Sequence, residues 1–151
     1  GISSKKETLK LKINTSNPLI STFSDHWDKG RFSSSKWDKV INVDATTLDQ
    51  LINDHGHPRY IKIDVEGFEL EVLKGLTKKT GIISFEFTSE FFKDAIKCLD
   101  YLNKLGYKKF NYSEGERKKF NFDWTSKDKI LEEIENKIKT NNYLWGDIYA
   151  Q

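Results

Sequence analysis

The feature that most constrains this chain is an alternation of strand-like and helix-like segments in its middle third. Three short apolar segments have the character of buried parallel strands, and the two segments between them place apolar side chains at helical spacing. The strands are expected at 60–65, 81–87 and 107–112, and the helices at 68–76 and 90–105. Successive strand–helix–strand units form right-handed crossovers and a parallel sheet, so the sequence predicts an α/β fold.

The chain of 151 residues has the length of one domain, which we divide into four parts. Residues 1–45 are expected to form a hairpin, whose strands enclose an aromatic loop that is either pinned by its aromatic side chains or a functional lid. Residues 46–112 form the βαβαβ core. A charged helical insertion is expected over 113–142, and a last strand, inserted antiparallel into a mixed sheet, over 143–151.

Local signals mark the ends of several expected helices. Thr47 and Gln50 have the spacing of a capping box, in which the threonine hydroxyl accepts a hydrogen bond from the backbone of the third following residue. Ser89 has the position of a cap for the helix at 90–105, and Gly106 that of its left-handed terminator.

Composition excludes several classes of protein. Hydrophobic residues make up 36% and aromatic residues 13% of the chain, which is too much for a disordered segment. No apolar run is long enough to span a membrane, and the start lacks the pattern of a signal peptide. The single cysteine, Cys98, excludes an internal disulfide and favours a reducing, cytoplasmic compartment.

The sequence predicts no metal site, because His55 and His57 have no further cysteine or histidine ligand nearby. The 25 basic and 23 acidic residues nearly balance, so the overall charge makes no strong case for nucleic acid as a partner. The chain contains no methionine and begins at Gly1, so we expect it to be processed or to be part of a longer protein.

Acidic side chains follow the first strand of the expected core. Asp64 and Glu66 lie at the carboxyl end of that strand, and Gly67 opens the turn into the next helix. Ligands of open α/β sheets bind beyond the carboxyl ends of the strands, so these carboxylates could bind a ligand or act as a base. Alternatively, they are acids at the start of a helix, where the helix dipole favours negative charge.

Several motifs in consistent order resemble the C-terminal half of an FkbM-type methyltransferase. They are Val43-x-x-x-Thr47-Leu-Asp-Gln-Leu51, Tyr60-Ile-Lys-Ile-Asp-Val-Glu-Gly-Phe-Glu69, Val72-Leu-Lys-Gly75 and Ile83-Ser-Phe-Glu-Phe87. The resemblance covers about residues 1–113, and the final strand also fits. It implies a Rossmann-like class I methyltransferase fold, truncated here to its C-terminal strands, and S-adenosylmethionine (SAM) as cofactor.

The resemblance also implies a site and an activity. Asp64 would be the base or the group that orients the acceptor, with Glu66 and Glu86 as further catalytic candidates, and the reaction would be O-methylation of a small molecule or sugar. The family binds SAM through a glycine-rich loop after its first strand, but no Gly-x-Gly occurs in this chain. The residues that would bind the cofactor therefore stay unknown, and this chain alone is expected to lack activity.

Two other functions stay open at the level of sequence. The half-fold could be a binding or interaction module without catalysis. A cluster of basic and aromatic residues could instead bind nucleic acid, since such residues neutralise phosphates and stack on bases, although acids dilute it. Its members are Lys108, Lys109, Arg117, Lys118 and Lys119 with Phe110, Tyr112, Phe120 and Phe122.

The strand at 60–65 is central in the family but would have one unpaired edge in this chain. Because its apolar residues make that edge adhesive, we expect a two-fold homodimer formed through it. The alternatives are that the hairpin folds over the edge or that another chain supplies the N-terminal half of the fold.

Overall fold

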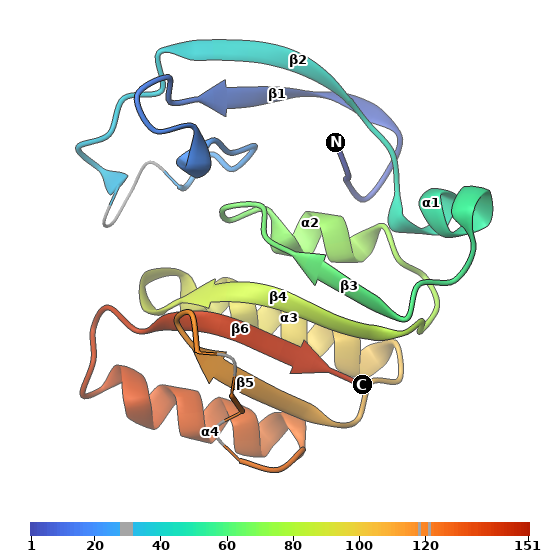
Figure 1. The fold of residues 1–151 in the computed structure, drawn as a ribbon, viewed down its shortest axis with the longest axis vertical. Coiled ribbons are helices and arrows are strands. Elements are labelled where there is room, and N and C mark those ends of the chain that lie inside the picture. Colours follow the sequence, from blue (N-terminus) through green and yellow to red (C-terminus); the bar gives the residue numbers. More distant parts are fainter. Residues whose placement is uncertain (28–31, 118, 121) are drawn as a thin grey trace.

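The computed structural model describes residues 1–27, 32–117, 119, 120 and 122–151, and contains two separate sheets (Figure 1). A two-stranded antiparallel sheet consists of β1 (Glu7–Ile13) and β2 (Lys39–Ala45). The four-stranded sheet has, in spatial order, β3 (Tyr60–Ile63), β4 (Ile82–Thr88), β6 (Trp145–Ala150) and β5 (Phe110–Glu114). The mixed α/β architecture predicted from the sequence is confirmed.

The last strand, β6, lies between β4 and β5 and runs antiparallel to both. The chain that leaves β5 returns to the start of β5, where Thr125 pairs with Phe110. Helix α4 (Lys127–Ile138) then carries the chain back along the sheet, so β6 must enter in the opposite direction. The predicted antiparallel insertion is therefore confirmed, and β3 and β4 are parallel neighbours, as predicted.

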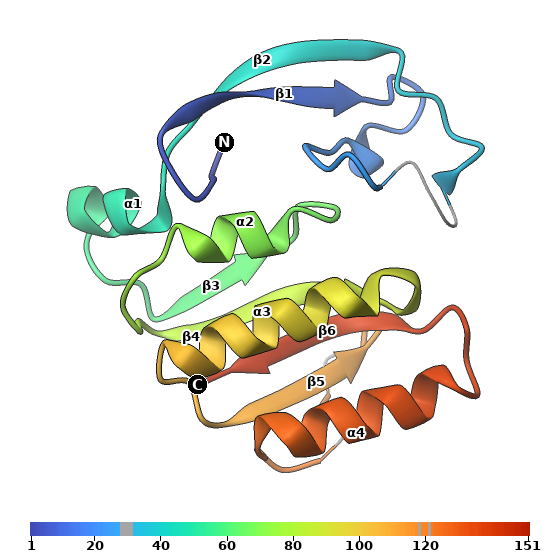
Figure 2. The ribbon, with the colours of Figure 1, turned by 180° about the vertical axis from the view of Figure 1, so that it is seen from behind.

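Three helices cover one face of this sheet. Figure 2 shows α3 (Phe92–Lys104) crossing β4 and β6, with α2 (Glu69–Lys74) and α4 on either side of it. Their apolar faces and the inward side chains of the strands form one core. Its largest fully buried side chains include Tyr107, Tyr112, Phe85, Phe110, Leu73, Leu99 and Ile134.

The predicted helix ends are confirmed in part. Thr47 caps α1 (Leu48–His55) by accepting a hydrogen bond from Gln50 N at 3.1 Å, and Gly106 follows α3 with a φ of 101°. The prediction that Ser89 caps the next helix is wrong. Ser89 begins a 3-10 turn, and its hydroxyl instead donates to Asn142 O at 2.6 Å, which ties it to the loop before β6.

The segment between β1 and β2 is held by two of its tryptophans. Trp37 Nε1 donates to Ile20 O at 3.2 Å, at the end of the 3-10 turn η1 (Pro18–Ile20). Trp27 is buried against Phe91, with ring centroids 5.2 Å apart. These contacts confirm that aromatic side chains pin the loop, whereas a lid function stays a prediction, and residues 28–31 lie outside the described part.

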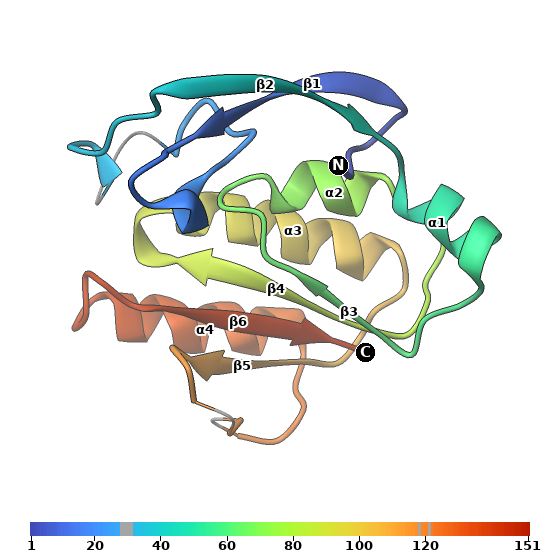
Figure 3. The same ribbon diagram turned by 45° about the horizontal axis from the view of Figure 1, so that its top comes forward.

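The outer edge of β3 pairs with no other strand in the described part of the chain. The hairpin does not cover this edge: Figure 3 shows β1 and β2 above α2, away from the sheet. Pairing of the edge with a second copy stays a prediction. No helix among the described residues is both long enough and apolar enough to cross a membrane.

Candidate active site

The three acids singled out from the sequence lie together at the carboxyl ends of β3 and β4 in the four-stranded sheet. Asp64 and Glu66 directly follow β3, and Glu86 lies near the end of β4. Because β3 and β4 are parallel neighbours, their carboxyl ends lie together. One carboxylate oxygen from each of the three residues falls within 4.8 Å of the others.

The turn that carries these acids has an unusual backbone. Glu66 has a φ of 54° and Gly67 a φ of 89°, so two successive residues are left-handed, and only the second is a glycine. A left-handed glutamate is costly and persists only where its surroundings hold it. Thr22 contributes to this by donating its hydroxyl to Glu66 O at 2.6 Å.

Glu69, the first residue of α2, stabilises the turn that precedes the helix. Its buried carboxylate accepts hydrogen bonds from Val65 N at 3.3 Å and from Gly67 N at 3.2 Å. In the described part of the chain, neither Asp64 nor Glu66 bonds its side chain to the start of α2. The alternative that the helix dipole favours these two acids at the start of a helix stays a prediction.

The acids are crowded and partly removed from water. Burial, followed by the charges of Asp64, Glu66 and Glu69, raises the pKa of Glu86 to about 8. Burial, followed by the charges of Asp64 and Glu69, raises the pKa of Glu66 to about 7. Two carboxyl groups that exchange protons near neutral pH at the edge of a sheet are typical of an acid–base site.

A lysine supplies the positive charge of the cluster. Lys62 Nζ lies 3.6 Å from Asp64 Oδ2 and donates a hydrogen bond to Asp147 on β6. Although burial alone would lower the pKa of Lys62, the hydrogen bond to Asp147 and the charges of both aspartates raise it. The three clustered carboxylates could also ligate a hard divalent cation, but Lys62 already neutralises part of their charge.

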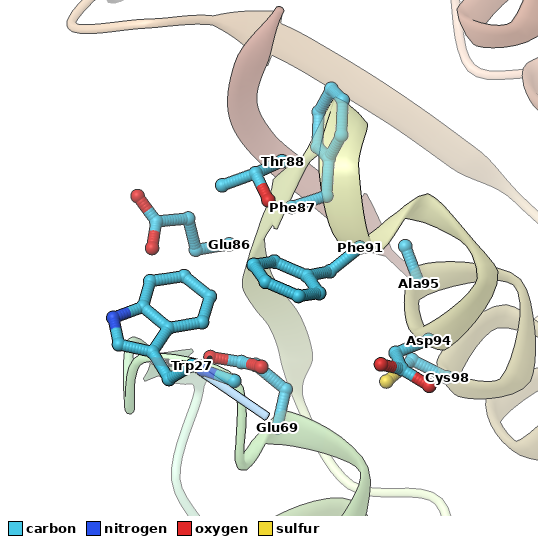
Figure 4. A pocket seen from close by; sticks show the side chains of 10 residues that line it. Trp27, Glu69, Glu86, Phe87, Thr88, Phe91, Asp94, Ala95 and Cys98 are labelled. Carbon is cyan, nitrogen blue, oxygen red and sulfur yellow. Dashed lines mark hydrogen bonds between the residues drawn. The ribbon is translucent and has the colours of Figure 1, made fainter. Parts of the chain in front are cut away.

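Aromatic and hydroxyl groups form the wall next to Glu86 (Figure 4). Trp27 and Thr88 are 4% and 7% exposed, and within the described residues Trp27 Nε1 and Thr88 Oγ1 have no hydrogen-bond partner. A buried donor without a partner costs about 1–3 kcal/mol, so both groups are available to a bound acceptor. The indole stacks on Phe91, which fixes its orientation beside Glu86.

A wider cavity adjoins the three acids. It has a volume of about 700 Å³, which matches the size of a small-molecule site. Its lining combines the acids with hydroxyl and aromatic side chains: Ser21, Phe23, Asp64, Glu66, Glu86 and Trp145. The Ser21 hydroxyl also lacks a hydrogen-bond partner among the described residues.

The predicted nucleic-acid cluster does not assemble. Phe110 and Tyr112 are buried, so they cannot stack on bases. Lys108 and Lys109 precede β5, whereas Arg117 follows it, at the other end of the strand. Lys118, also part of that cluster, lies outside the described residues.

Several residues of the site carried no clear signal in the sequence. Glu69 is the third acid within six residues, and this spacing was the only feature of the sequence that pointed to a role for Glu69 in the site. Trp27 and Asp147 come from distant segments, and only the path of the loop and the insertion of β6 bring them to the acids.

The strand order and the helix layer define a mixed α/β protein, and its clustered acids lie at the carboxyl ends of parallel strands, where open α/β sheets commonly bind ligands. The family model of the methyltransferase FkbM domain matches residues 1–109, which is most of the chain. The chain therefore belongs to the FkbM methyltransferase family. No curated protein and no solved structure shows a significant match to it.

The raised pKa values predict how stability depends on pH. Glu66 and Glu86 bind protons more tightly in the folded than in the unfolded chain. The free energy of unfolding should therefore fall as the pH rises from about 5 to about 9. Chemical denaturation at both ends of this range should show a smaller fall for the double variant Glu66→Gln/Glu86→Gln than for the matched control Glu133→Gln/Glu135→Gln. Equal falls in both variants would contradict the expectation.

Proposed function

We propose that the protein transfers a methyl group from SAM to a hydroxyl oxygen of a small molecule or sugar. Membership of the FkbM methyltransferase family supports methyl transfer. The observation that carries the oxygen acceptor is Glu86, a carboxylate with a pKa of about 8 beside an open cavity. A hydroxyl must lose its proton during methylation, and a group with this pKa can take it near neutral pH.

The residues of the chain suit one end of the cofactor. When bound, SAM supplies an electrophilic methyl group on a positively charged sulfonium. Asp64 brings negative charge to the carboxyl ends of β3 and β4, and Glu66 and Glu86 add to it as the pH rises through their pKa values of about 7 and about 8. Opposite charges attract strongly in a partly buried site. The strand order β3-β4-β6-β5 supports a Rossmann-like fold of which the chain holds the C-terminal strands.

We assign different tasks to the three acids. Glu86 takes the proton of the acceptor hydroxyl, which leaves the acceptor oxygen able to receive the methyl group that bound SAM would supply. Asp64, held by Lys62 at 3.6 Å, accepts a hydrogen bond that orients the acceptor. Such alignment contributes strongly to a displacement between two bound groups. Glu66 keeps the pKa of Glu86 raised through its neighbouring charge.

Methyl transfer by the natural full-length protein tests this function. The protein is incubated with isotopically labelled SAM and a panel of sugars, phenols and aliphatic alcohols, and labelled products are located by mass spectrometry. An O-methyl product supports the proposal. Transfer to nitrogen or carbon acceptors alone would overturn the assignment of the acceptor, and a complete lack of transfer would favour a binding module without catalysis.

The chain of 151 residues by itself is expected to bind SAM weakly, with a Kd above about 1 mM. The glycine-rich loop through which the family binds the cofactor does not occur in the sequence, so few groups are available to hold the adenosine. Isothermal titration calorimetry of the purified chain checks this expectation. A Kd in the low micromolar range would contradict it.

A further inference from the structure

The end of the four-stranded sheet at which β3, β4 and β5 begin lies opposite the acids and is basic. The segments that enter β3, β4 and β5 each carry cationic side chains just before the strand begins. They are Arg59 before β3, Lys78 and Lys79 before β4, and Lys108 and Lys109 before β5. Because these three strands run in the same direction, their starts meet at one edge, and the topology gathers charges that are about 50 residues apart in the sequence.

These segments enclose a groove of about 890 Å³. No aspartate or glutamate lines it within the described part of the chain. Five of its lining residues have basic side chains, namely His57, Arg59, Lys79, Lys108 and Lys109. Although the chain as a whole is almost neutral, its charges are unevenly distributed over the sheet. The acids lie where β3 and β4 end, and the basic groove lies where β3, β4 and β5 begin.

Backbone hydrogen bonds fix the three entering segments to one another. Arg59 O accepts from Ile82 N at 2.9 Å, which ties the first segment to β4. Lys109 exchanges backbone hydrogen bonds with Gln151 at 2.9 Å and 3.2 Å, next to the end of β6. The backbone segments that carry the cations are therefore ordered, which reduces the entropy lost when an anion binds.

Tyr107 locks the second segment to the third. Its hydroxyl accepts from Thr80 N at 3.1 Å and donates to the carbonyl oxygen of Thr80 at 3.0 Å, while the ring is fully buried. Lys79 Nζ lies 5.0 Å from the centre of this ring. The tyrosine thus places a cation at the rim of the groove.

The charges of the groove are not neutralised within the chain. In the part of the chain that the structure describes, no aspartate or glutamate forms an ion pair with Arg59, Lys79, Lys108 or Lys109. Lys108 and Lys79 donate only to backbone or amide oxygens, at 2.9–3.4 Å. Like charges held together without a counterion repel one another, so a bound anion would stabilise this edge.

We propose that this groove binds a small anion that carries two or more phosphate groups. Arginine can bind a phosphate through two parallel hydrogen bonds, and lysines bind it as point charges, so cations on three segments suit successive phosphates. Among the described residues, no phenylalanine, tyrosine or tryptophan lines the groove, which disfavours single-stranded nucleic acid because its bases bind mainly by stacking on such rings.

Calorimetric titration with inorganic tripolyphosphate tests the groove. We expect saturable binding of one anion, with orthophosphate at least about tenfold weaker because it reaches fewer cations. The triple variant Arg59→Gln/Lys79→Gln/Lys109→Gln should lower the affinity for tripolyphosphate by at least about tenfold. The matched control Lys5→Gln/Lys10→Gln/Lys93→Gln removes the same charge elsewhere and should change the affinity by less than about twofold.

Three results would overturn the proposal. They are a lack of tripolyphosphate binding, equal losses in the groove and control variants, and tighter binding of a DNA duplex than of tripolyphosphate at the groove. Circular dichroism should show that both triple variants are folded, since all six side chains are exposed. The measurement requires neither SAM nor methyl transfer, so it is independent of the function proposed above.

Discussion

Replacing Glu86 by glutamine is expected to lower the methyl-transfer rate of the natural full-length protein by about a hundredfold or more. Glutamine has nearly the shape of glutamate but cannot take a proton from the acceptor. The fold should survive, because glutamine is neutral like the protonated Glu86 that predominates below about pH 8. Steady-state kinetics with the methyl acceptor identified in the product assay measure the effect.

The pH profile separates a base from a merely structural carboxylate. With Glu86 as base, the wild-type rate should rise with pH and level off above about pH 8, because the deprotonated form is the active one. The Glu86→Gln variant should lose this rise. Glu135→Gln, on the exposed side of α4, is the matched control and should keep both rate and profile.

Asp64→Asn distinguishes the two roles. If Asp64 orients the acceptor, this variant should mainly raise KM, and the pH profile should remain. A hundredfold loss in Asp64→Asn together with an unchanged rate in Glu86→Gln would transfer the role of base to Asp64. Unchanged turnover in both variants would remove the acids from the mechanism.

Replacing Phe85 by alanine is expected to lower the free energy of unfolding by about 3–5 kcal/mol. Phe85 lies on β4 and is fully buried in the core between the sheet and its helices. Removing the ring loses its burial and leaves a cavity that the neighbouring strands cannot close. Denaturant titration of the two proteins gives the difference directly.

Leu19→Ala is the control for this measurement. Leu19 is 83% exposed, so its truncation should change the stability by less than about 0.5 kcal/mol. A loss below about 1 kcal/mol for Phe85→Ala would mean that the core can close around the missing ring.

Much of the fold could be predicted from the sequence because its signals are local. The spacing of apolar residues predicts the strands and helices of the core, and Thr47 and Gly106 mark helix ends where the structure has them. Ser89 shows the limit of such signals. The Ser89 hydroxyl donates a hydrogen bond to the backbone oxygen of Asn142, which is 53 residues away in the chain. No local sequence pattern indicates this contact.

The position of the site could be predicted from the sequence, but the burial and the surroundings of each acid could not. Asp64, Glu66 and Glu86 could be placed together because they follow parallel strands. The structure, however, leaves Asp64 exposed and paired with Lys62, while Glu86 is partly buried and has a pKa raised to about 8. Burial depends on how Trp27 and β6 pack around each acid, which the local sequence does not show.

The two walls of the site belong to units of very different local stability. Glu86 lies on β4, which is paired on both sides, so its amide hydrogens should exchange with solvent only when the whole domain unfolds. Trp27 belongs to the segment between β1 and β2, and among the described residues these two strands form a sheet of their own, separate from that of β4. A sub-global opening of this hairpin would therefore uncover the pocket without moving the acid on β4. An acceptor could thus enter and leave the site at a small fraction of the free energy that holds the domain together.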